Sequence, residues 1–596
     1  MQTLQDLVAS LEGRGCATAI SWKEDSKLHK LSFKELYHQI IHYSKGFLQL
    51  GLGPGDRIAI FSRNIPEWIG ITLGIDNAGL IDVPRGETST LEEINYIIEH
   101  SQAKVAIVED DTLLDRVKER KHPNLEGILS IREINGVTNI LKIEEKGKNS
   151  KKSLPDLTKN DTASIIYTSG TTGTPKGVEL THGNFVSNIN AVLKRVPIFD
   201  NDKLISILPA WHAFERMAKY VALAAGAETF YTTSQSILQD LAEQKPTFMA
   251  SVPRIWELIY NKIMEKVKEE SAPKRRLFHI ALKASIDYKK KEGFNLLRLI
   301  EALSYNYLDK KVFSELRAKL GGRFKYAVSG GSALPRRIDD FFNAAGIEVL
   351  EGYGLTETAP VLSVRIPGKK SLGSVGPLLE GVKAKIIDPE TGNKLPIGKE
   401  GVIYVNGPNV MKGYYKNFEE TRKVLKDGWL DTGDLGHFDK KGNLAISGRI
   451  KDIIVLLNGE NVNPIPIEEE LIQSDFIAAA VVTGQNWKNL GALIVPNFEH
   501  LKQYYKEKGI PVSEDNSEPF DFNHPRIKDI YKSEINRLVN KSARFKHYER
   551  IQEFRLVSEP FSIGKELTPT LKPIRKKIEE LYESKISNMK ETMHKK

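Results

Sequence analysis

Residues 167–178 read Tyr167-Thr-Ser-Gly-Thr-Thr-Gly-Thr-Pro-Lys-Gly-Val178 and continue a short apolar run, Ala163–Thr168. A β-branched apolar run that opens into glycines and hydroxyls predicts a buried strand followed by an anion-binding loop. Glycine lets the backbone approach a phosphate closely, and Lys176 supplies a positive charge. We call residues 167–178 the phosphate loop. Its groups expected to face phosphate oxygens belong to Thr168, Ser169, Gly170, Thr171, Thr172 and Gly173.

The phosphate loop differs from the P-loop of GTPases. That motif requires Gly-x-x-x-x-Gly-Lys-Ser/Thr, whereas Pro175 precedes Lys176 here and Gly177 follows it. An ordinary surface loop would not explain so many glycines and hydroxyls directly after an apolar strand. The sequence therefore indicates a phosphate-binding loop of another type.

Short apolar runs alternate with helical stretches around the phosphate loop. The strands expected from this pattern are Ile58–Ser62, Val105–Val108 and Ala163–Thr168, and the helices are Pro66–Ala78 and Asn184–Lys194. Repeated strand–helix alternation predicts an α/β fold with largely parallel sheets.

Two later regions differ in character. Residues 263–320 combine frequent Lys and Arg with apolar residues at helical spacing. They predict a helical insertion, either a solvated hairpin or a face that contacts a membrane or a partner. From Gly381 onward, apolar residues alternate with lysines, which is the period of half-exposed strands.

The last part of the chain follows Gly448 and reads as a smaller α+β segment. Its basic end, Ser587–Lys596, has few apolar residues, so we expect it to be frayed.

Composition limits the classes of protein that remain. The 596 residues are 40% hydrophobic and 27% charged, as in ordinary globular proteins. The single cysteine, Cys16, excludes an intramolecular disulfide framework and a cysteine-cluster metal site. No apolar stretch is long enough to span a bilayer. A formal charge of +9 suits anionic ligands or an anionic membrane surface, but no nucleic-acid-binding signature accompanies it.

The phosphate loop resembles the signature of the adenylate-forming superfamily, which includes acyl-CoA synthetases, peptide-synthetase adenylation domains and luciferases. The resemblance implies that this loop holds the β- and γ-phosphates of ATP. Four further motifs follow in the order of that superfamily, across about 400 residues and covering most of the intervening chain.

The second motif is Glu351-Gly-Tyr-Gly-Leu-Thr-Glu-Thr358, which resembles the adenine and metal motif. Tyr353 offers a flat face to a purine, with Gly352 and Gly354 beside it. Thr356 is expected to bond an α-phosphate oxygen, and Glu357, assisted by Thr168, to hold Mg²⁺. Taken alone, this segment also fits a helix start with a capping threonine.

The third motif, Gly428-Trp-Leu-Asp-Thr-Gly-Asp434, resembles the ribose motif. A carboxylate accepts two hydroxyl donors, so Asp434 is the candidate for the ribose; its alternative role is a turn. The fourth, Gly448-Arg-Ile-Lys-Asp452 with Gly459 beyond it, resembles the domain hinge and the loop on the thiol side. Arg449 is expected to contact ribose or phosphate, and Lys451 to be the hinge residue.

The fifth motif, Leu567-Thr-Pro-Thr-Leu-Lys-Pro-Ile-Arg575, resembles the segment that carries the catalytic lysine. Lys572 is the candidate, with Lys565 as the alternative, because Pro573 departs from the usual pattern after the lysine.

Three segments resemble the long-chain fatty-acyl-CoA synthetase branch: Leu208–Arg216, Ser251–Trp256 and Ser329–Pro335. His212 is expected either to position the substrate carboxylate or to be a half-buried structural histidine. Gly330 and Gly331 leave room for an acyl chain beside the nucleotide.

The resemblance implies a long-chain fatty acid–CoA ligase that uses ATP, Mg²⁺ and CoA. The alternatives are an acyl–acyl-carrier-protein synthetase, a fatty-acyl-AMP ligase and, more remotely, a non-catalytic lipid-binding relative. We expect a cytoplasmic protein with peripheral contact at the inner membrane face and no nucleic-acid partner. The expected architecture is a large N-terminal domain, 1–447, of stacked α/β sheets with a β-rich part over about 376–447. A small mobile α+β domain, 448–596, would carry the catalytic lysine.

Overall fold

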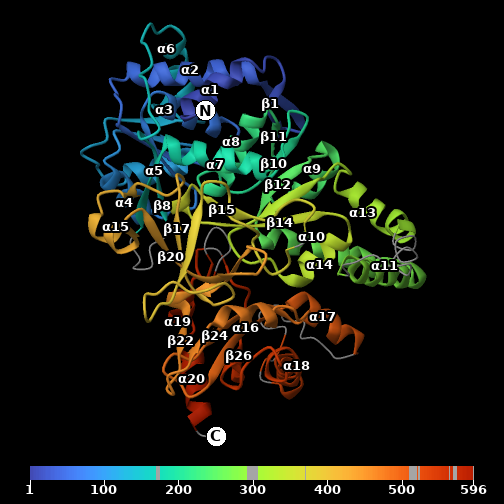
Figure 1. The fold of residues 1–596 in the computed structure, drawn as a ribbon. Helices are drawn as coiled ribbons and strands as arrows, with labels where there is room; N and C mark the ends of the chain where they lie inside the picture. The colour runs from blue at the N-terminus through green and yellow to red at the C-terminus, as the bar shows by residue number, and fades with distance from the viewer. Residues whose placement is uncertain are drawn as a thin grey trace.

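The computed structural model describes residues 1–168, 175–290, 306–369, 371–508, 520, 522, 524–562, 564–567 and 573–594. Ser169, Gly170, Thr171, Thr172, Gly173 and Lys572 therefore lie outside the described residues. Figure 1 shows a large N-terminal body of stacked sheets and helices, with the C-terminal part beneath it.

Two large sheets form the body. The sheet that carries the phosphate loop runs, from edge to edge, through β18 (Gly413–Tyr414), β9 (Lys176–Thr181), β8 (Thr162–Thr168), β4 (Ile81–Arg85), β3 (Arg57–Phe61), β5 (Val105–Val108), β6 (Gly127–Ser130) and β7 (Thr138–Asn139). From β8 to β7 the neighbours are parallel, whereas β9 pairs antiparallel with both β8 and β18.

The second sheet runs through β15 (Val361–Val364), β14 (Glu348–Gly354), β13 (Tyr326–Ser329), β12 (Phe248–Ser251), β10 (Lys203–Ser206), β11 (Glu228–Tyr231), β1 (Thr18–Glu24) and β2 (Lys27–Ser32). Its interior is parallel, and only the pairs at its edges, β14 with β15 and β1 with β2, are antiparallel. The predicted α/β class with largely parallel sheets is confirmed.

Strand alternation explains the layers. In β3, Ile58 and Ile60 join one hydrophobic cluster, while Ala59 and Phe61 join another on the opposite face. The outer face is covered by α4 (Leu91–Ser101) and α5 (Asp111–Lys118). The inner face meets α1 (Leu4–Glu12), α2 (Phe33–Gln49), α3 (Glu67–Asn77), α7 (His182–Arg195) and α8 (Ala213–Ala225).

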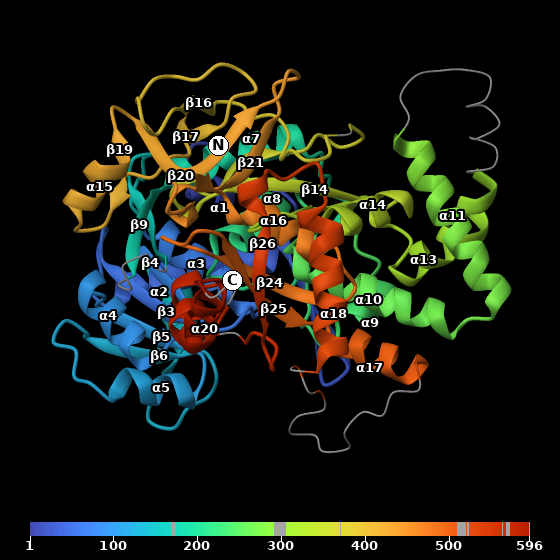
Figure 2. The same cartoon turned by 90° about the horizontal axis from the view of Figure 1, so that it is seen from below.

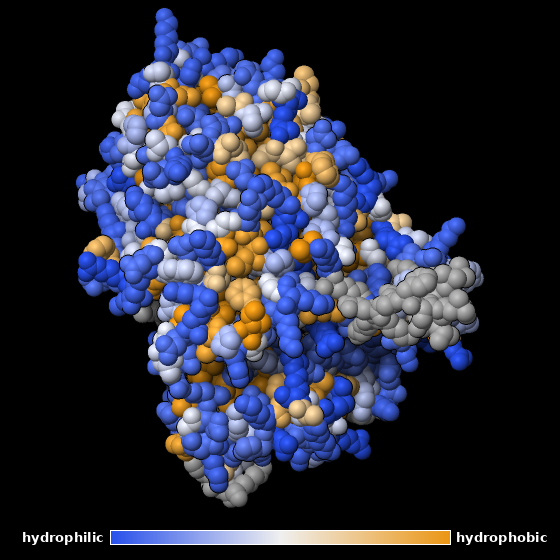
Figure 3. Space-filling model, viewed as in Figure 1, coloured by the Kyte–Doolittle hydropathy of each residue, from blue (hydrophilic) through white to orange (hydrophobic). Residues whose placement is uncertain are grey.

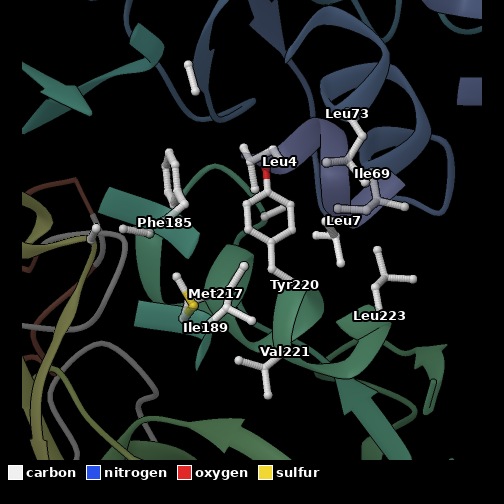
Figure 4. Packing of buried hydrophobic residues seen from close by; sticks show 14 of the residues in the cluster. Leu4, Leu7, Ile69, Leu73, Phe185, Ile189, Met217, Tyr220, Val221 and Leu223 are labelled. Carbon is white, nitrogen blue, oxygen red and sulfur yellow. The ribbon is translucent and has the colours of Figure 1, made fainter. Parts of the chain in front are cut away.

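Figure 4 shows this central layer, in which Tyr220 and Met217 of α8 face Phe185 of α7 and Leu4 of α1. The second sheet closes the stack. Its far face packs on α9 (Ile237–Gln244), α10 (Pro253–Glu269), α11 (Ala272–Lys290) and α14 (Arg336–Ala344). Beyond residue 305, η1 (Asp309–Phe313) and α13 (Ser314–Lys319) continue the helical region, which projects from the body.

A smaller sheet follows along the chain: β16 (Lys383–Ile387), β17 (Gly401–Asn406), β20 (Trp429–Phe438), β19 (Leu425–Lys426) and β21 (Leu444–Arg449). Helix α15 (Phe418–Val424) lies between β18 and β19 along the chain, and α6 (Ile140–Lys148) packs on α2. The predicted strands Ile58–Ser62, Val105–Val108 and Ala163–Thr168 are confirmed within one residue as β3, β5 and β8.

The C-terminal part has its own core. It contains the hairpin β22 (Ile454–Val455) and β23 (Asn461–Val462), and the sheet β24 (Ile477–Thr483), β25 (Leu490–Pro496) and β26 (Ile551–Leu556). One face of that sheet packs on α16 (Pro464–Leu471), α17 (Phe498–Glu507) and α18 (Pro525–Ile535). The other packs on α19 (Arg575–Leu581) and α20 (Glu583–His594); Figure 2 shows α20 beside this sheet from below.

The prediction of a frayed C-terminal end is wrong for its described part. Residues up to His594 continue α20, and Met589 is fully buried in the cluster that includes Leu493 and Val495. Ile586 and Met593 of the same helix also pack against this cluster, so an apolar stripe at helical spacing docks a basic helix.

The face shown in Figure 3 is mostly hydrophilic, with apolar patches over the upper and central parts and toward the C-terminal part. Among the residues described, no helix combines the length and the apolar character needed to cross a bilayer.

Candidate active site

Asp434 is the centre of one polar cluster. Its side chain is 5% exposed; Oδ2 accepts a hydrogen bond of 2.7 Å from the Tyr353 hydroxyl, and Oδ1 lies 2.8 Å from Arg449 Nε. Burial first, and then the negative charge of Asp434, raise the pKa of Tyr353 far above its usual value. Asp434 raises the pKa of Arg449. Three residues from separate motifs thus meet at one carboxylate.

Strand pairing brings Asp434 and Arg449 together. They are direct partners in the antiparallel β20–β21 register, so their side chains lie on the same face. The turn before Asp434 is fixed locally, because its backbone N–H donates to Thr432 Oγ1 at 3.1 Å and Gly433 adopts a φ of 67°. Glycine adopts this left-handed conformation without strain.

The segment after Tyr353 carries Thr356 and Glu357. Both belong to the 3₁₀ turn η2 (Thr356–Thr358) and are half-buried. Glu357 Oε1 accepts a hydrogen bond of 2.9 Å from the Tyr414 hydroxyl. Gly354 is required here, because a Cβ at this position would lie 1.9 Å from the Pro360 carbonyl oxygen. Gly352 has more space, with its nearest side-chain atom, on Val328, 3.2 Å from an added Cβ.

The described ends of the phosphate loop are two antiparallel neighbours. Thr168 at the end of β8 faces Lys176 at the start of β9. The ammonium of Lys176 forms an ion pair with Glu420 of α15 and lies 5.1 Å from the centre of the Tyr414 ring. Lys176 and Glu357 therefore share Tyr414 as a common neighbour.

These contacts form one connected set. Lys176 contacts Tyr414, Tyr414 bonds Glu357, and Glu357 belongs to the same segment as Tyr353, which bonds Asp434. Residues that lie more than 250 positions apart in the chain are thereby brought into one site.

The donor set suits a nucleotide-bound Mg²⁺. Magnesium prefers hard oxygen ligands and is commonly held by one or two carboxylates together with substrate phosphates. Glu357 supplies such a carboxylate at the end of the connected set. Within the described ranges, no group of three or more His, Cys, Asp or Glu side chains could form an all-protein cage.

The segment around His212 precedes α8. His212 is the N-cap residue of that helix, is half-buried, and lies beside the Trp211 ring at 6.2 Å between centroids. Phe214 fills the space beside Gly330, because its ring atoms would lie 3.3 Å from a Cβ added there. The room expected beside Gly330 is therefore occupied by an aromatic ring in this structure.

The remaining predicted residues lie toward the C-terminal part. Lys451 is in the 3₁₀ turn η3 (Ile450–Asp452). Partial desolvation of its ammonium, and then the positive charge of Arg449, lower the pKa of Lys451. Gly459 is an exposed turn residue with a φ of 83°. Lys565 is 57% exposed and lies 3.7 Å from Glu566. The bridge between Leu567 and Pro573 brackets the segment of Lys572.

Sequence reasoning missed Tyr414 and Glu420. Both follow Gly413 in an ordinary polar segment, and only the pairing of β18 with β9 brings them to Lys176. It also missed Arg85. The available sequence signal was that Arg85 ends the strand β4 and is followed directly by Gly86.

Solved structures share this architecture. The adenylation domain of a carboxylate reductase from Mycobacterium chelonae matches with a TM-score of 0.76 and 20% identity, over 98% of this chain and 91% of its own. An anthranilate CoA ligase in complex with anthranoyl-AMP matches with a TM-score of 0.74 and 19% identity, over 97% of each chain. The fold is that of adenylate-forming enzymes.

Family models match almost the whole chain. The AMP-binding enzyme model covers residues 9–415, and the AMP-binding enzyme C-terminal domain model covers 451–594. The chain belongs to the AMP-binding enzyme family.

Curated relatives cover nearly the same length. A chloroplastic long-chain-fatty-acid–[acyl-carrier-protein] ligase of Arabidopsis thaliana is 33% identical over 94% of this chain and 82% of its own. A long-chain-fatty-acid–CoA ligase of Mycobacterium bovis is 33% identical over 93% and 91%. Long-chain-fatty-acid–CoA ligase 5 of Rattus norvegicus is 31% identical over 94% and 84%.

Proposed function

We propose that this enzyme is a long-chain fatty acid–CoA ligase. ATP and a fatty acid give acyl-AMP and pyrophosphate, and the acyl group then passes to CoA with release of AMP. The observation that carries the proposal is the connected set from Lys176 through Tyr414 and Glu357 to Tyr353 and Asp434, in a chain that belongs to the AMP-binding enzyme family.

Each residue has a task in the first step. Asp434 accepts the ribose hydroxyls while Tyr353 and Arg449 hold its carboxylate in place. The ring of Tyr353 lies against adenine, and Thr356 bonds an α-phosphate oxygen. The backbone and hydroxyl groups of the phosphate loop, with Lys176, hold the outer phosphates. Catalysis here consists of positioning and charge neutralisation, because the carboxylate nucleophile is already ionised.

Glu357, assisted by Thr168, would hold Mg²⁺, which neutralises phosphate charge when bound. His212 would orient the fatty carboxylate at the start of α8. Lys572 would approach the α-phosphate from the C-terminal part.

The main alternative concerns the thiol that accepts the acyl group, which would be acyl carrier protein in place of CoA. The similarity to an acyl-carrier-protein ligase at the same identity as a CoA ligase favours a test of both acceptors. Purified protein given ATP, magnesium and palmitate should release pyrophosphate, and thioester should form with CoA in preference to holo-acyl carrier protein. The opposite preference would establish the carrier-protein reaction, and release of ADP would refute the adenylation chemistry.

Lys572 is expected to serve only the first step. Lys572→Ala should reduce adenylation by about 10²–10³-fold, the effect of removing one preorganised stabiliser, and spare thioester formation from preformed acyl-AMP. Lys565→Ala is the matched control. An equal loss in both half-reactions would count against this role.

The second step requires space for the thiol. We propose that residues 448–596 form a mobile domain that rotates about Lys451, beyond an N-terminal domain of residues 1–447. Lys451→Pro should keep adenylation and lose thioester formation. If both half-reactions persist, the hinge lies elsewhere.

We also propose a cytoplasmic enzyme that touches the membrane peripherally. The formal charge of +9 and the basic helix α11, which carries six Lys or Arg and one Asp, support this location, and long-chain acids partition into bilayers. Co-sedimentation should occur with anionic vesicles and weaken in high salt. Equal recovery with neutral vesicles would contradict an electrostatic contact.

A further inference from the structure

Arg85 joins two parts of the candidate site that belong to different sheets. It is the last residue of β4 and is 8% exposed. Its Nη1 donates to the backbone carbonyl of Tyr167 at 2.9 Å, and its Nη2 donates to Glu93 at 2.9 Å. Tyr167 is followed by Thr168, where the described part of the phosphate loop ends. Arg85 thus fixes the backbone at the base of that loop.

The same guanidinium contacts the segment that begins α8. Its carbon lies 5.0 Å from the centre of the Trp211 ring, within the range of a cation–π contact. Trp211 is 6% exposed and directly precedes His212. Gly86 also packs against the Trp211 indole, because a Cβ there would lie 2.2 Å from Trp211 Nε1. The indole therefore packs directly on residues 85–86.

We propose that Arg85 is a positioning residue that couples the base of the phosphate loop to the segment carrying His212. This inference rests on the proposed function. Adenylation requires the carboxylate, held near His212, to meet an α-phosphorus whose position depends on the phosphate loop. A displacement of about 1 Å between two such groups costs on the order of 10²-fold in rate. One planar guanidinium, hydrogen-bonded on one side and stacked on the other, holds both parts at a fixed separation.

Loss of Arg85 is expected to act locally because a second arginine already holds the same elements. Arg216 of α8 is fully buried and bonds Asp82 of β4 at 2.8 Å and 2.9 Å and Ser164 of β8 at 2.8 Å. Asp82 and Ser164 are direct partners in the β4–β8 register. Strands β4 and β8 and helix α8 thus remain joined through Arg216 when the contact between Arg85 and Trp211 is removed.

The test compares two arginines with similar contacts. Arg14 also donates to a backbone carbonyl, that of Ala224, and stacks on an aromatic ring, Phe33, at 5.6 Å. It does so at the opposite end of α8, away from His212. Arg85→Lys and Arg14→Lys therefore remove the same kind of contact at the two ends of one helix. Gly86→Ala serves as a second variant, because it displaces Trp211 while Arg85 remains.

The measurements are pyrophosphate release with fatty acid and ATP, and thioester formation from preformed acyl-AMP. Arg85→Lys and Gly86→Ala should each lower kcat for adenylation by about 10–100-fold, as expected for misplaced reactants. Thioester formation should stay within about threefold, because acyl and phosphate are already joined and need no coupling. Arg14→Lys should leave both half-reactions near wild type.

The outcomes separate this inference from the proposed function. A wild-type protein that releases no pyrophosphate with any fatty acid overturns the proposed function itself. If the wild type is active, unchanged adenylation in both Arg85→Lys and Gly86→Ala overturns the coupling. So does an equal loss in the two half-reactions, or the same loss in Arg14→Lys, because each would indicate a general structural effect.

Discussion

Lys176 forms an ion pair within the protein. Its ammonium contacts Glu420, and hydrogen bonds from Lys176 and then Lys423 lower the pKa of Glu420 to about 2. A phosphate must compete with this carboxylate for the lysine. Glu420 is therefore expected to weaken ATP binding slightly, while it holds the Lys176 ammonium beside the Tyr414 ring.

Removing the charge of Glu420 should free Lys176. We expect Glu420→Gln to lower the KM for ATP by about two- to fivefold, since solvent-screened ion pairs contribute only weakly to binding. Glu419→Gln, an exposed neighbour on the same helix, is the control in initial-rate assays of pyrophosphate release. A higher KM in Glu420→Gln would mean that Glu420 helps to bind ATP.

Asp434 should be much less tolerant. Asp434→Asn removes a buried charge that has two donors, and we expect kcat/KM for ATP to fall by about 10–100-fold, as for a lost charged hydrogen bond. Tyr353→Phe keeps the ring and removes only the hydroxyl that orients Asp434, so its loss should be smaller. The same pyrophosphate assay measures both. If Tyr353→Phe and Asp434→Asn lower kcat/KM equally, the Tyr353 hydroxyl is as important for ATP binding as the charge of Asp434.

These residues also show how far sequence reasoning reaches. Asp434, Arg449 and Glu357 were predicted because each stands in a local motif whose spacing is preserved. Tyr414, Glu420 and Arg85 were not, because their significance arises from contacts across 57 to 244 positions. No periodicity or local motif records that Arg85 will meet Trp211.

At the scale of elements, prediction succeeded where one physical rule governed a segment. The short apolar runs at Ile58–Ser62 and Val105–Val108 predicted the bounds of β3 and β5 within one residue. It failed at α20, because a basic composition suggested fraying, whereas Ile586, Met589 and Met593 form an apolar face that packs on the sheet. The positions of Lys and Arg on a helix say little about whether its opposite face is covered.

The docking of α20 can be measured directly. Met589→Ala should destabilise the C-terminal part by about 2–4 kcal/mol, as for other buried large-to-small substitutions. Urea unfolding monitored by Trp487 fluorescence, in the same cluster, would report it. Lys590→Ala, exposed and adjacent, should change little. If Met589→Ala unfolds like wild type, the helix contributes no stability in solution.

At the scale of the whole molecule, polar contacts between described residues join α14 and α10 to the C-terminal part. Arg337 of α14 lies 2.9 Å from Asp475, and its backbone N–H donates to Gln473 at 3.3 Å. Lys268 of α10 donates to Gln503 of α17 at 2.6 Å. Because Asp475 is 66% exposed, this ion pair is worth at most about 1 kcal/mol. A junction held by such a weak ion pair would suit the domain rotation that we propose above.

One carboxylate makes the junction sensitive to pH. Burial first, and then the charge of Glu351 in β14, raise the pKa of Glu469 on α16 to about 7; Arg544 opposes this shift, and Glu468 and Glu470 add to it. Glu469 keeps its proton in this arrangement but loses it once exposed. A raised carboxylate pKa lowers stability as pH rises from the ordinary value of about 4.3 toward the raised one, and the loss is complete above it.

The junction should therefore weaken between about pH 4.5 and pH 7, by at most about 3 kcal/mol for a shift of this size. Glu469→Gln cannot ionise, so its Tm should vary less with pH than that of wild type and exceed it at pH 8. Exposed Glu580→Gln should follow the wild-type profile. Thermal unfolding from pH 5 to pH 8 measures all three. Parallel profiles for wild type and Glu469→Gln would mean that this carboxylate stays solvated, and that the junction opens for reasons other than its charge.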